Sequence, residues 1–299
     1  MPSVQSHVLR ALLRLTVKRK LARSSDPLVA RKVFDNAMPA PKGASFRAGE
    51  VGGIAGEWAQ AGAPPAGTMY YLHGGGYFAC SPRTHRSITG GFAVRGLSVF
   101  APDYRLAPEH PFPAAVDDAL AGYRGILASV APEQLLIGGD SAGGGLALAT
   151  LLAARDAGLP MPAAAILFSP WTDLAGTGAS VKTNEKRDSM LFGPRLGEGA
   201  EIYLNGADAT TPLASPLYGE LAGLPPCFIQ VGDEEILLDD STRFAARARA
   251  AGVKAEVSVW PGLPHVWHVN QAFLPEARQA LDQAAAFARG ALASGGKAA

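Results

Sequence analysis

Short hydrophobic runs and amphipathic segments alternate along the chain from about residue 66 onward. Six runs rich in Val, Ile, Leu, Tyr and Phe predict β-strands at residues 68–72, 97–102, 134–137, 163–168, 227–231 and 255–260. Apolar spacing of helical type predicts helices at residues 84–94, 114–128, 142–155, 240–251 and about 275–289, followed by a frayed tail at 294–297. This order predicts a mostly parallel sheet with helices on both faces.

Two regions break the alternation. One is the first forty or so residues, and the other runs from about residue 176 to residue 214. The second region is polar and Gly-rich, with a weak helical stretch at about 196–204. An insertion between two strands lies at one end of the sheet, where such segments often form lids or binding walls.

The composition is typical of a globular protein and excludes some classes of function. Of 299 residues, 48% are hydrophobic and 18% are charged, and the formal net charge is +1 with both signs scattered. We therefore expect no nucleic-acid partner. The two cysteines, Cys80 and Cys227, lie in unrelated contexts. They indicate neither a disulfide framework nor a zinc site, and we expect small buried thiols in a reducing compartment.

The N-terminal segment has a helical apolar face made of Val8, Leu9, Leu12, Leu13, Leu15 and Val17. Arg10 and Arg14 interrupt this run, and three basic residues at 18–20 follow it, whereas a signal peptide has the opposite order. No segment approaches the eighteen or so apolar residues that span a bilayer. A basic amphipathic helix either lies on a membrane surface or packs on its own protein; we expect packing and a cytoplasmic location.

The strongest chemical motif lies between a predicted strand and a predicted helix. Gly139, Ser141 and Gly143 form the pattern Gly-x-Ser-x-Gly at this junction. In a nucleophile elbow the turn is so tight that flanking Cβ atoms clash, and the serine is strained with its Oγ exposed. A Gly-rich phosphate-binding turn is the alternative, but the P-loop lysine is absent. We interpret Ser141 as a nucleophile.

An oxyanion hole is predicted after the strand at residues 68–72. This strand ends at His73, and the loop that follows contains Gly74, Gly75 and Gly76. Without side chains, such a loop approaches a substrate carbonyl closely and directs N–H groups at its oxygen. The N–H of Ala142 is expected to be a further donor. We interpret His73 as a residue that orients the loop, with catalysis by His73 as the alternative.

Three motifs together resemble a known family. They are His-Gly-Gly-Gly at residues 73–76, Asp-Tyr-Arg-Leu-Ala-Pro-Glu-His at 103–110 and Gly-Asp-Ser-Ala-Gly-Gly at 139–144. This set resembles the hormone-sensitive-lipase-like family, and more narrowly its bacterial family IV esterases, over about residues 66–290. The resemblance implies an α/β-hydrolase fold with a helical cap. Residues 1–45 and the insertion at about 176–214 would then form the cap of a catalytic domain spanning residues 46–299.

The stretch at residues 103–113 is expected to be structural. Arg105 and Glu109 are spaced for a local ion pair in a turn bracketed by prolines. The resemblance likewise implies that this stretch supports the oxyanion loop.

The catalytic base is expected to follow the nucleophile and the acid in chain order. Beyond Ser141 the histidines are His265 and His268, in a turn after the last predicted strand. The family pattern has the base directly after this turn, which implies His265. His268 is the alternative, and we expect it to be structural.

The catalytic acid departs from the commonest family form. The usual pattern is an acid, any residue, Leu, any residue, Asp and an acid. Matching Leu237 and Asp239 to it implies Glu235, where most relatives have Asp, and a glutamate can equally hold the imidazole tautomer. The rival acids are Asp233, Glu234, Asp239 and Asp240, with Asp239 next in order. Asp239 or Asp240 is also expected to cap the following helix.

These features predict a carboxylic-ester hydrolase that uses Ser141, Glu235 and His265 and a covalent acyl-enzyme. The resemblance implies small or medium acyl groups. An amidase or peptidase with the same residues is the alternative. A non-catalytic receptor is a further one, but the plant gibberellin receptors of this family have lost the histidine that is present here. We expect a small-molecule ester as substrate, no cofactor, no metal and no stable membrane insertion. The resemblance also leaves a homodimer open.

Overall fold

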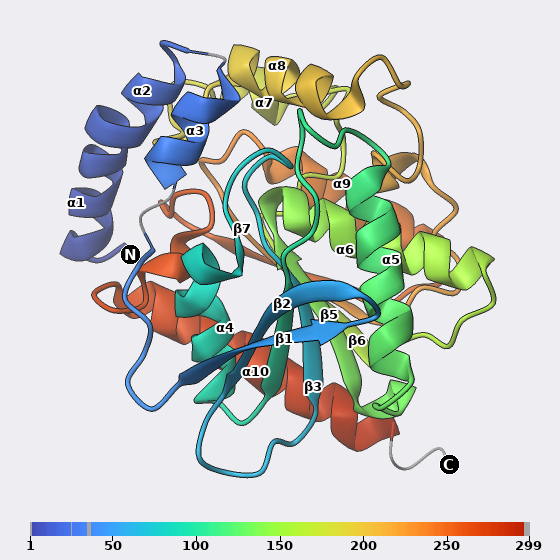
Figure 1. Cartoon of the computed structure of the whole chain (residues 1–299). Helices are drawn as coiled ribbons and strands as arrows, with labels where there is room; N and C mark the ends of the chain where they lie inside the picture. The colour runs from blue at the N-terminus through green and yellow to red at the C-terminus, as the bar shows by residue number, and fades with distance from the viewer. Residues whose placement is uncertain (1, 25, 35–36, 296–299) are drawn as a thin grey trace.

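Eight strands form one sheet at the centre of the protein (Figure 1). The computed structural model describes residues 2–24, 26–34 and 37–295. The order in the sheet is β1-β2-β4-β3-β5-β6-β7-β8, and pairing is parallel except where β2 meets β1 and β4. The strands are β1 Ser45–Val51, β2 Ile54–Gln60, β3 Thr68–Leu72, β4 Ser98–Pro102, β5 Leu135–Asp140, β6 Ala164–Phe168, β7 Cys227–Gly232 and β8 Ala255–Trp260.

Helices cover both faces of the sheet, as the alternating pattern predicts. The helices α4 (Arg86–Ala93) and α10 (Pro275–Gly295) pack on one face, and α5 (Ala114–Leu127), α6 (Ser141–Asp156) and α9 (Leu238–Ala250) pack on the other. Alternate residues of a strand point to opposite faces, so Met69 and Tyr71 join one core while Tyr70 and Leu72 join the other. Burial on both faces explains the continuous hydrophobic runs.

Two further groups of helices lie at the end of the sheet where the parallel strands end (Figure 1). The N-terminal group comprises α1 (Val4–Leu13), a π-helical turn η1 (Arg14–Lys18), α2 (Arg19–Leu21) and α3 (Pro27–Phe34). The insertion between β6 and β7 carries α7 (Ser180–Thr183) and α8 (Gly193–Leu204). Short 3-10 turns complete the fold: η2 Pro82–His85, η3 Pro132–Gln134, η4 Pro216–Tyr218 and η5 Trp267–Asn270.

The sequence predictions of secondary structure are confirmed from β3 onward, with small shifts at the ends. The last helix is longer than expected, because α10 continues through Gly295; the remainder of the predicted tail, residues 296 and 297, lies outside the described residues. The hairpin of β1 and β2 was not predicted. Its strands are half-exposed and carry Glu, Arg and Gln among the apolar residues. The Gly52-Gly53 pair between them, both with positive φ, is the signal that could have found it.

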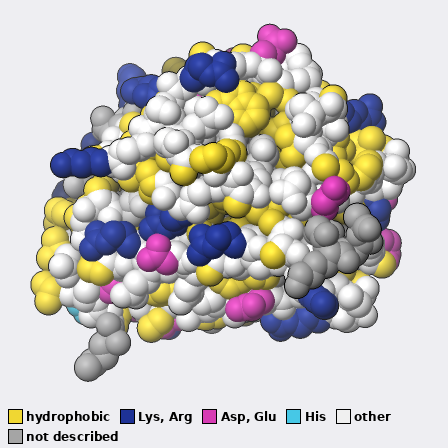
Figure 2. Space-filling model, turned by 90° about the horizontal axis from the view of Figure 1, so that it is seen from below, with side chains coloured by type: hydrophobic (Ala, Val, Ile, Leu, Met, Phe, Trp, Pro, Cys, Tyr) yellow, Lys and Arg dark blue, Asp and Glu magenta, His cyan; other side chains and the backbone are white. Residues whose placement is uncertain are grey.

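On the face seen from below, the described residues form no large block of one charge. Figure 2, the view from below, shows basic and acidic side chains interspersed with hydrophobic ones. In the described part of the chain, no helix is long and apolar enough to cross a membrane.

Candidate active site

Ser141 lies at a strained turn between β5 and α6. Its φ is 52°, in the left-handed region that non-glycine residues rarely adopt. The flanking glycines are required by close approach: a Cβ on Gly139 would lie 2.3 Å from the Gly143 carbonyl oxygen, and one on Gly143 would lie 2.2 Å from the Leu72 carbonyl oxygen. The turn thus presents the Ser141 hydroxyl at the end of the sheet, at the N-terminus of α6.

A continuous chain of hydrogen-bonding groups joins Ser141, His265 and Glu235. The distance from His265 Nε2 to Ser141 Oγ is 2.9 Å, and that from His265 Nδ1 to Glu235 Oε2 is 2.7 Å. Ser141 begins α6, Glu235 follows β7, and His265 follows β8. Neighbouring parallel strands end at the same edge of the sheet, which brings together residues 124 positions apart. The structure therefore brings together the three residues that the sequence analysis selected.

The surroundings of His265 favour its protonated form. Burial by itself would lower the pKa of His265, but the hydrogen bond and charge of Glu235 outweigh it and raise the pKa above 6.5. The charges of Asp188 and Asp140 act in the same direction. A neutral His265 in this setting is a strong proton acceptor for the Ser141 hydroxyl.

Glu235 is held rigidly by groups of three different segments. It is 1% exposed. Its Oε1 accepts hydrogen bonds from the N–H of Gly232 at 2.6 Å and from the hydroxyl of Ser169 at 2.8 Å, while Oε2 faces His265. From the insertion, the side-chain amide of Asn184 donates to the backbone oxygen of Glu235 at 2.9 Å. Ser169 and Asn184 were not singled out in the sequence.

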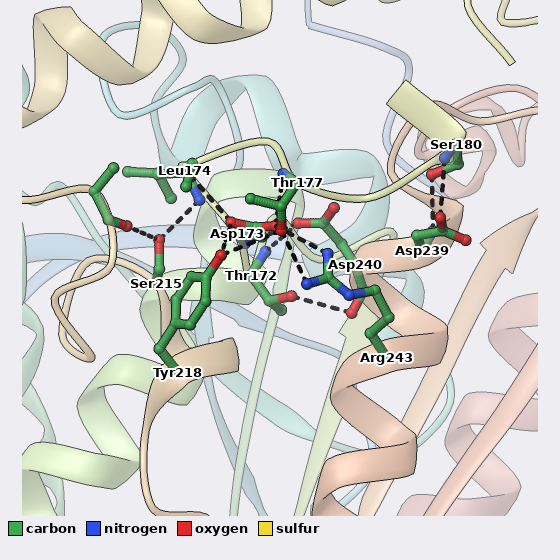
Figure 3. Close-up of polar contacts among 12 residues, drawn as sticks. Thr172, Asp173, Leu174, Thr177, Ser180, Ser215, Tyr218, Asp239, Asp240 and Arg243 are labelled. Carbon is green, nitrogen blue, oxygen red and sulfur yellow. Dashed lines mark hydrogen bonds and ion pairs between the residues drawn. The ribbon is translucent and has the colours of Figure 1, made fainter. Parts of the chain in front are cut away.

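The four rival acids have other partners. Asp233 accepts from the Gly262 N–H at 2.7 Å, and Glu234 pairs with Arg10. Asp239 accepts from the Ser180 N–H at 2.9 Å, and Asp240 accepts from the Thr172 N–H at 2.8 Å (Figure 3). The expected capping of α9 is wrong, because Leu237 is its N-cap residue; of the two aspartates in its first turn, Asp239 binds the insertion and Asp240 binds the segment just before it.

His268 and His73 are both buried, and neither lies in the Ser141–His265–Glu235 chain. His268 Nε2 lies 3.0 Å from Gln230 Oε1, and its ring stacks on Phe168. The ring of His73 stacks on Tyr104, and its Nδ1 lies 2.8 Å from the Gly74 carbonyl oxygen. Burial lowers the pKa of each to about 3, so both rings are neutral at ordinary pH. Contact with Gly74 is consistent with the orienting role predicted for His73.

The glycine loop lies beside Ser141, but its three N–H groups are not equivalent. The N–H of Gly74 already donates to Oδ1 of Asp140 at 3.2 Å, so its expected contribution to an oxyanion hole does not fit. Gly75 has a φ of 119°, and a Cβ there would lie 2.2 Å from the Ala79 carbonyl oxygen. In the described part of the chain, neither Gly75 nor Gly76 donates its N–H to a backbone carbonyl. The candidate donors are therefore Gly75, Gly76 and Ala142.

Asp140, the residue before Ser141, organises this loop and was not singled out in the sequence. Its carboxylate receives hydrogen bonds from the Tyr71 hydroxyl at 2.7 Å and the Gly74 N–H, and it lies 3.2 Å from His85 Nε2. Burial opposes charge on both partners, yet their mutual attraction lowers the pKa of Asp140 and raises that of His85. The buried contact between Asp140 and His85, together with the hydrogen bond from Gly74, thus fixes the loop to the elbow. The position of Asp140 within the Gly-Asp-Ser-Ala-Gly motif is the sequence signal that could have identified it.

A largely apolar cavity of about 340 Å³ opens above Ser141 and His265. Its walls come from the glycine loop, the N-terminal helices and the insertion. Val17 and Val33 of the N-terminal helices line the cavity, as do Leu191 and Ile202 of the insertion. Among the described residues, no group of three or more His, Cys, Asp or Glu side chains is placed to hold a metal ion.

The expected ion pair between Arg105 and Glu109 is wrong. Arg105 pairs with Asp118 of α5 at 2.7 Å, and Glu109 accepts from Arg31 of α3 at 2.8 Å. Both partners come from elements distant in sequence, which spacing within a turn does not reveal. The stretch supports the glycine loop directly, because the Tyr104 hydroxyl donates to the His73 carbonyl oxygen at 2.6 Å.

The sheet order, the serine elbow and the positions of Glu235 and His265 define an α/β-hydrolase. A family model described as alpha/beta hydrolase fold matches residues 69–269. An acetyl-hydrolase from Streptomyces hygroscopicus is 46% identical over 247 residues, covering 82% of this chain and 83% of the relative. An esterase from Acinetobacter venetianus is 36% identical over 284 residues, covering 93% of this chain and 94% of the relative.

Solved structures narrow the relationship. The structure of EstE5 soaked by ethyl alcohol has a TM-score of 0.94 and 43% identity, covering 97% of this chain and 99% of that chain. An esterase from the bacterial hormone-sensitive lipase family has a TM-score of 0.90 and 40% identity, covering 98% of this chain and 99% of that chain. The chain belongs to the hormone-sensitive-lipase group of bacterial esterases within the α/β-hydrolases. It is a serine carboxylesterase.

Proposed function

We propose that this carboxylesterase hydrolyses esters of short to medium acyl groups through a Ser141–His265–Glu235 triad and a covalent acyl-enzyme. The observation that carries the proposal is the chain of contacts of 2.9 Å and 2.7 Å from Ser141 Oγ to Glu235 Oε2 at the floor of the cavity. A single histidine can move every proton that the reaction requires, and the relatives named esterase and carboxylesterase favour esters over amides as substrates.

The reaction proceeds in two acyl transfers. Ser141 Oγ attacks the ester carbonyl carbon while His265 Nε2 accepts the hydroxyl proton. His265 then gives that proton to the departing alcohol, and the acyl group stays on Ser141. A water molecule, deprotonated by His265, attacks the acyl-enzyme; His265 then returns this proton to Ser141 Oγ as the carboxylic acid leaves. Glu235 holds Nδ1–H and stabilises the imidazolium, which forms twice in each cycle.

The negative charge of each tetrahedral intermediate is stabilised by backbone donors. We assign these to the N–H groups of Gly75, Gly76 and Ala142, with the positive end of α6 behind them. Gly74 serves this assignment indirectly, because its contact with Asp140 sets the position of the loop.

The cavity supports the choice of acyl group. Its volume of about 340 Å³ lies at the lower end of the range for small-molecule sites, and its walls are mostly apolar. Two of the relatives are named acetyl-hydrolases, and one EstE5 structure was soaked with p-nitrophenyl butyrate. Across p-nitrophenyl esters we expect kcat/KM to peak at acyl chains of roughly two to eight carbons and to fall for longer chains. A maximum at much longer chains contradicts the assignment.

We also propose that residues 1–45 and the insertion at about 176–214 act together as a cap on the catalytic domain of residues 46–299. The two segments are hydrogen-bonded to each other: Lys18 Nζ donates to the Asp188 carbonyl oxygen at 2.7 Å, and Arg14 donates to the Arg187 carbonyl oxygen at 2.8 Å. Both line the cavity.

The triad is tested by labelling and by substitution of the nucleophile. A fluorophosphonate probe should modify Ser141 with one-to-one stoichiometry, identified by peptide mass spectrometry. Ser141→Ala should lose labelling and about 10⁶ of the turnover while keeping the thermal transition of the wild type. Retention of more than about one hundredth of the turnover would place the nucleophile elsewhere.

Location and assembly remain proposals from the sequence. Cys227 is a buried thiol, as expected and consistent with a cytoplasmic location, whereas Cys80 is only partly buried. A homodimer would have an available edge strand, because β8 ends the sheet. Sedimentation velocity decides the oligomeric state.

A further inference from the structure

The outer side of the N-terminal helix exposes an apolar stripe. Eight large hydrophobic side chains are exposed in the described residues, and five of them lie within the first 28 positions. Four belong to α1 and η1 at helical spacing, between 53% and 76% exposed: Val4, Val8, Leu12 and Leu15. Figure 1 shows α1 at the outer margin of the molecule. Exposed apolar side chains gathered in this way indicate an interaction surface.

The same helix is already anchored to the protein by its other side. Leu9 is buried in a cluster with Leu263 and Trp267, and Leu13 packs against this cluster. We expected this helix to pack on its own protein, and Leu9 and Leu13 make that contact. The exposed stripe contributes nothing to that packing and is free to contact a partner.

Positive charge accompanies the stripe. Residues 2–24 contain six Lys or Arg and no Asp or Glu, whereas the rest of the chain has 21 basic and 26 acidic residues. Arg19, Lys20 and Arg23 are exposed at the end of the same helical run. Among the described residues, no acidic side chain forms an ion pair with these three. An apolar stripe beside unneutralised basic residues fits the surface of an anionic lipid bilayer.

We propose that the outer face of α1, η1 and α2 docks this enzyme reversibly on anionic membrane surfaces. Val8, Leu12 and Leu15 would enter the boundary between headgroups and acyl chains, while Arg19, Lys20 and Arg23 contact lipid phosphates. A second copy fits less well, because a two-fold interface through this face would bring the two basic clusters together. The proposal concerns adsorption on the surface, not insertion across the bilayer.

Docking would bring the cavity close to the membrane. Leu13, Val17 and Leu21 of the same helical run line the cavity, on a different side of the helix from the stripe. Leu15 of the stripe and Val17 of the cavity wall both lie in η1, a π-helical turn that widens the helix within Arg14–Lys18. An ester that partitions into the bilayer would then meet the enzyme at the wall of its own binding site.

Vesicle co-sedimentation with the full chain tests the proposal. Vesicles of phosphatidylcholine alone are compared with vesicles made of equal parts of phosphatidylcholine and phosphatidylglycerol. We expect binding to the anionic vesicles only, weakening as salt rises above about 0.15 M. Val8→Ser and Lys20→Glu should each lower the partition coefficient about tenfold. Ser141→Ala should bind like the wild type, so failure of the proposed triad leaves this test intact.

Matched controls lie elsewhere on the surface. Val94→Ser removes an exposed valine of another region, and Lys254→Glu makes the same change in net charge just before β8. Both should bind vesicles as the wild type does. The proposal is overturned if Lys254→Glu lowers the partition coefficient as much as Lys20→Glu does. It is also overturned if the wild type does not bind anionic vesicles. A wild-type dimer that Val8→Ser converts to a monomer in sedimentation velocity also overturns it, because the stripe would then be a subunit interface.

Discussion

At the scale of single residues, the acid that we propose to orient His265 is the least common feature of the site. Glu235→Gln keeps the shape of the side chain but removes the charge that stabilises the imidazolium, so we expect turnover to fall by up to about 10⁴. Asp239→Asn is the matched control, since Asp239 contacts Ser180 rather than His265. It should cost stability but less than about tenfold in turnover. Steady-state rates with p-nitrophenyl butyrate compare the two; the reverse order of severity would make Asp239 the acid.

The pH dependence of the reaction reports on His265. The neutral imidazole accepts the Ser141 proton, so kcat/KM falls as pH drops through the pKa of the free enzyme. Burial lowers that pKa, but Glu235 more than compensates, so the midpoint should lie above 6.5. A pH–rate profile of the wild type measures it. His268→Asn should leave the midpoint in place, because burial keeps His268 neutral throughout this range. A midpoint below 6.5 contradicts the raised pKa.

At the scale of elements, the insertion supports the loop that carries the acid. Asp188 is 1% exposed; its Oδ2 accepts from the N–H of Ile236 at 2.9 Å, and its Oδ1 accepts from the Leu191 N–H at 2.8 Å. Asp188→Asn replaces one acceptor with a donor and removes a charge that raises the pKa of His265. We expect about a tenfold loss in kcat and a shift of the acidic limb to lower pH.

Asp173→Asn is the control for this prediction. Asp173 is also buried, but it pairs with Arg243 and is not among the charges that act on His265. Thermal stability should fall in both variants, and the acidic limb should move only in Asp188→Asn. If the acidic limb has the same midpoint in both variants, the Asp188 charge does not act on His265 and Asp188 is purely structural.

The glycine loop gives a prediction on backbone geometry. Gly75→Ala places a Cβ 2.2 Å from the Ala79 carbonyl oxygen, so the loop must move and its donors leave their positions. Loss of one oxyanion donor costs about 10² to 10³ in kcat. Gly53→Ala is the control: its φ is also positive, at 79°, but nothing lies within 4 Å of the added Cβ. It should lose about 1 kcal/mol of stability and no turnover per active site.

The sequence was informative where burial or chemistry imposes a local pattern. The strands from β3 to β7 are buried on both faces and therefore read as hydrophobic runs, and the elbow around Ser141 leaves a glycine pattern. The hairpin of β1 and β2 is half-exposed and leaves no such run. Partners such as Arg31 for Glu109, or Asn184 for the Glu235 backbone, depend on tertiary contacts that spacing does not encode.

At the scale of the whole molecule, one buried cluster joins both ends of the insertion to the catalytic domain (Figure 3). Asp173 accepts hydrogen bonds from the Thr177 hydroxyl at 2.6 Å, from the Tyr218 hydroxyl at 2.9 Å and from Arg243 at 3.0 Å. Asp240 of α9 lies beside it and accepts from the Thr172 N–H and the Asp173 N–H. The two buried carboxylates thus lie close together, and Arg243 pairs with Asp173 rather than with Asp240.

This crowding makes the stability of the fold depend on pH through Asp240. Burial and the nearby Asp173 charge raise the pKa of Asp240 to about 8, against 3.8 for an ordinary aspartate. Between these values the folded protein keeps a proton that the unfolded chain releases, so the Asp240 contribution to stability falls as pH rises from about 4 to 8. Asp240→Asn mimics the protonated side chain. Its Tm should decline less over this interval than that of the wild type, in calorimetric scans at successive pH values. Parallel declines in both proteins would show that Asp240 is ionised in the fold.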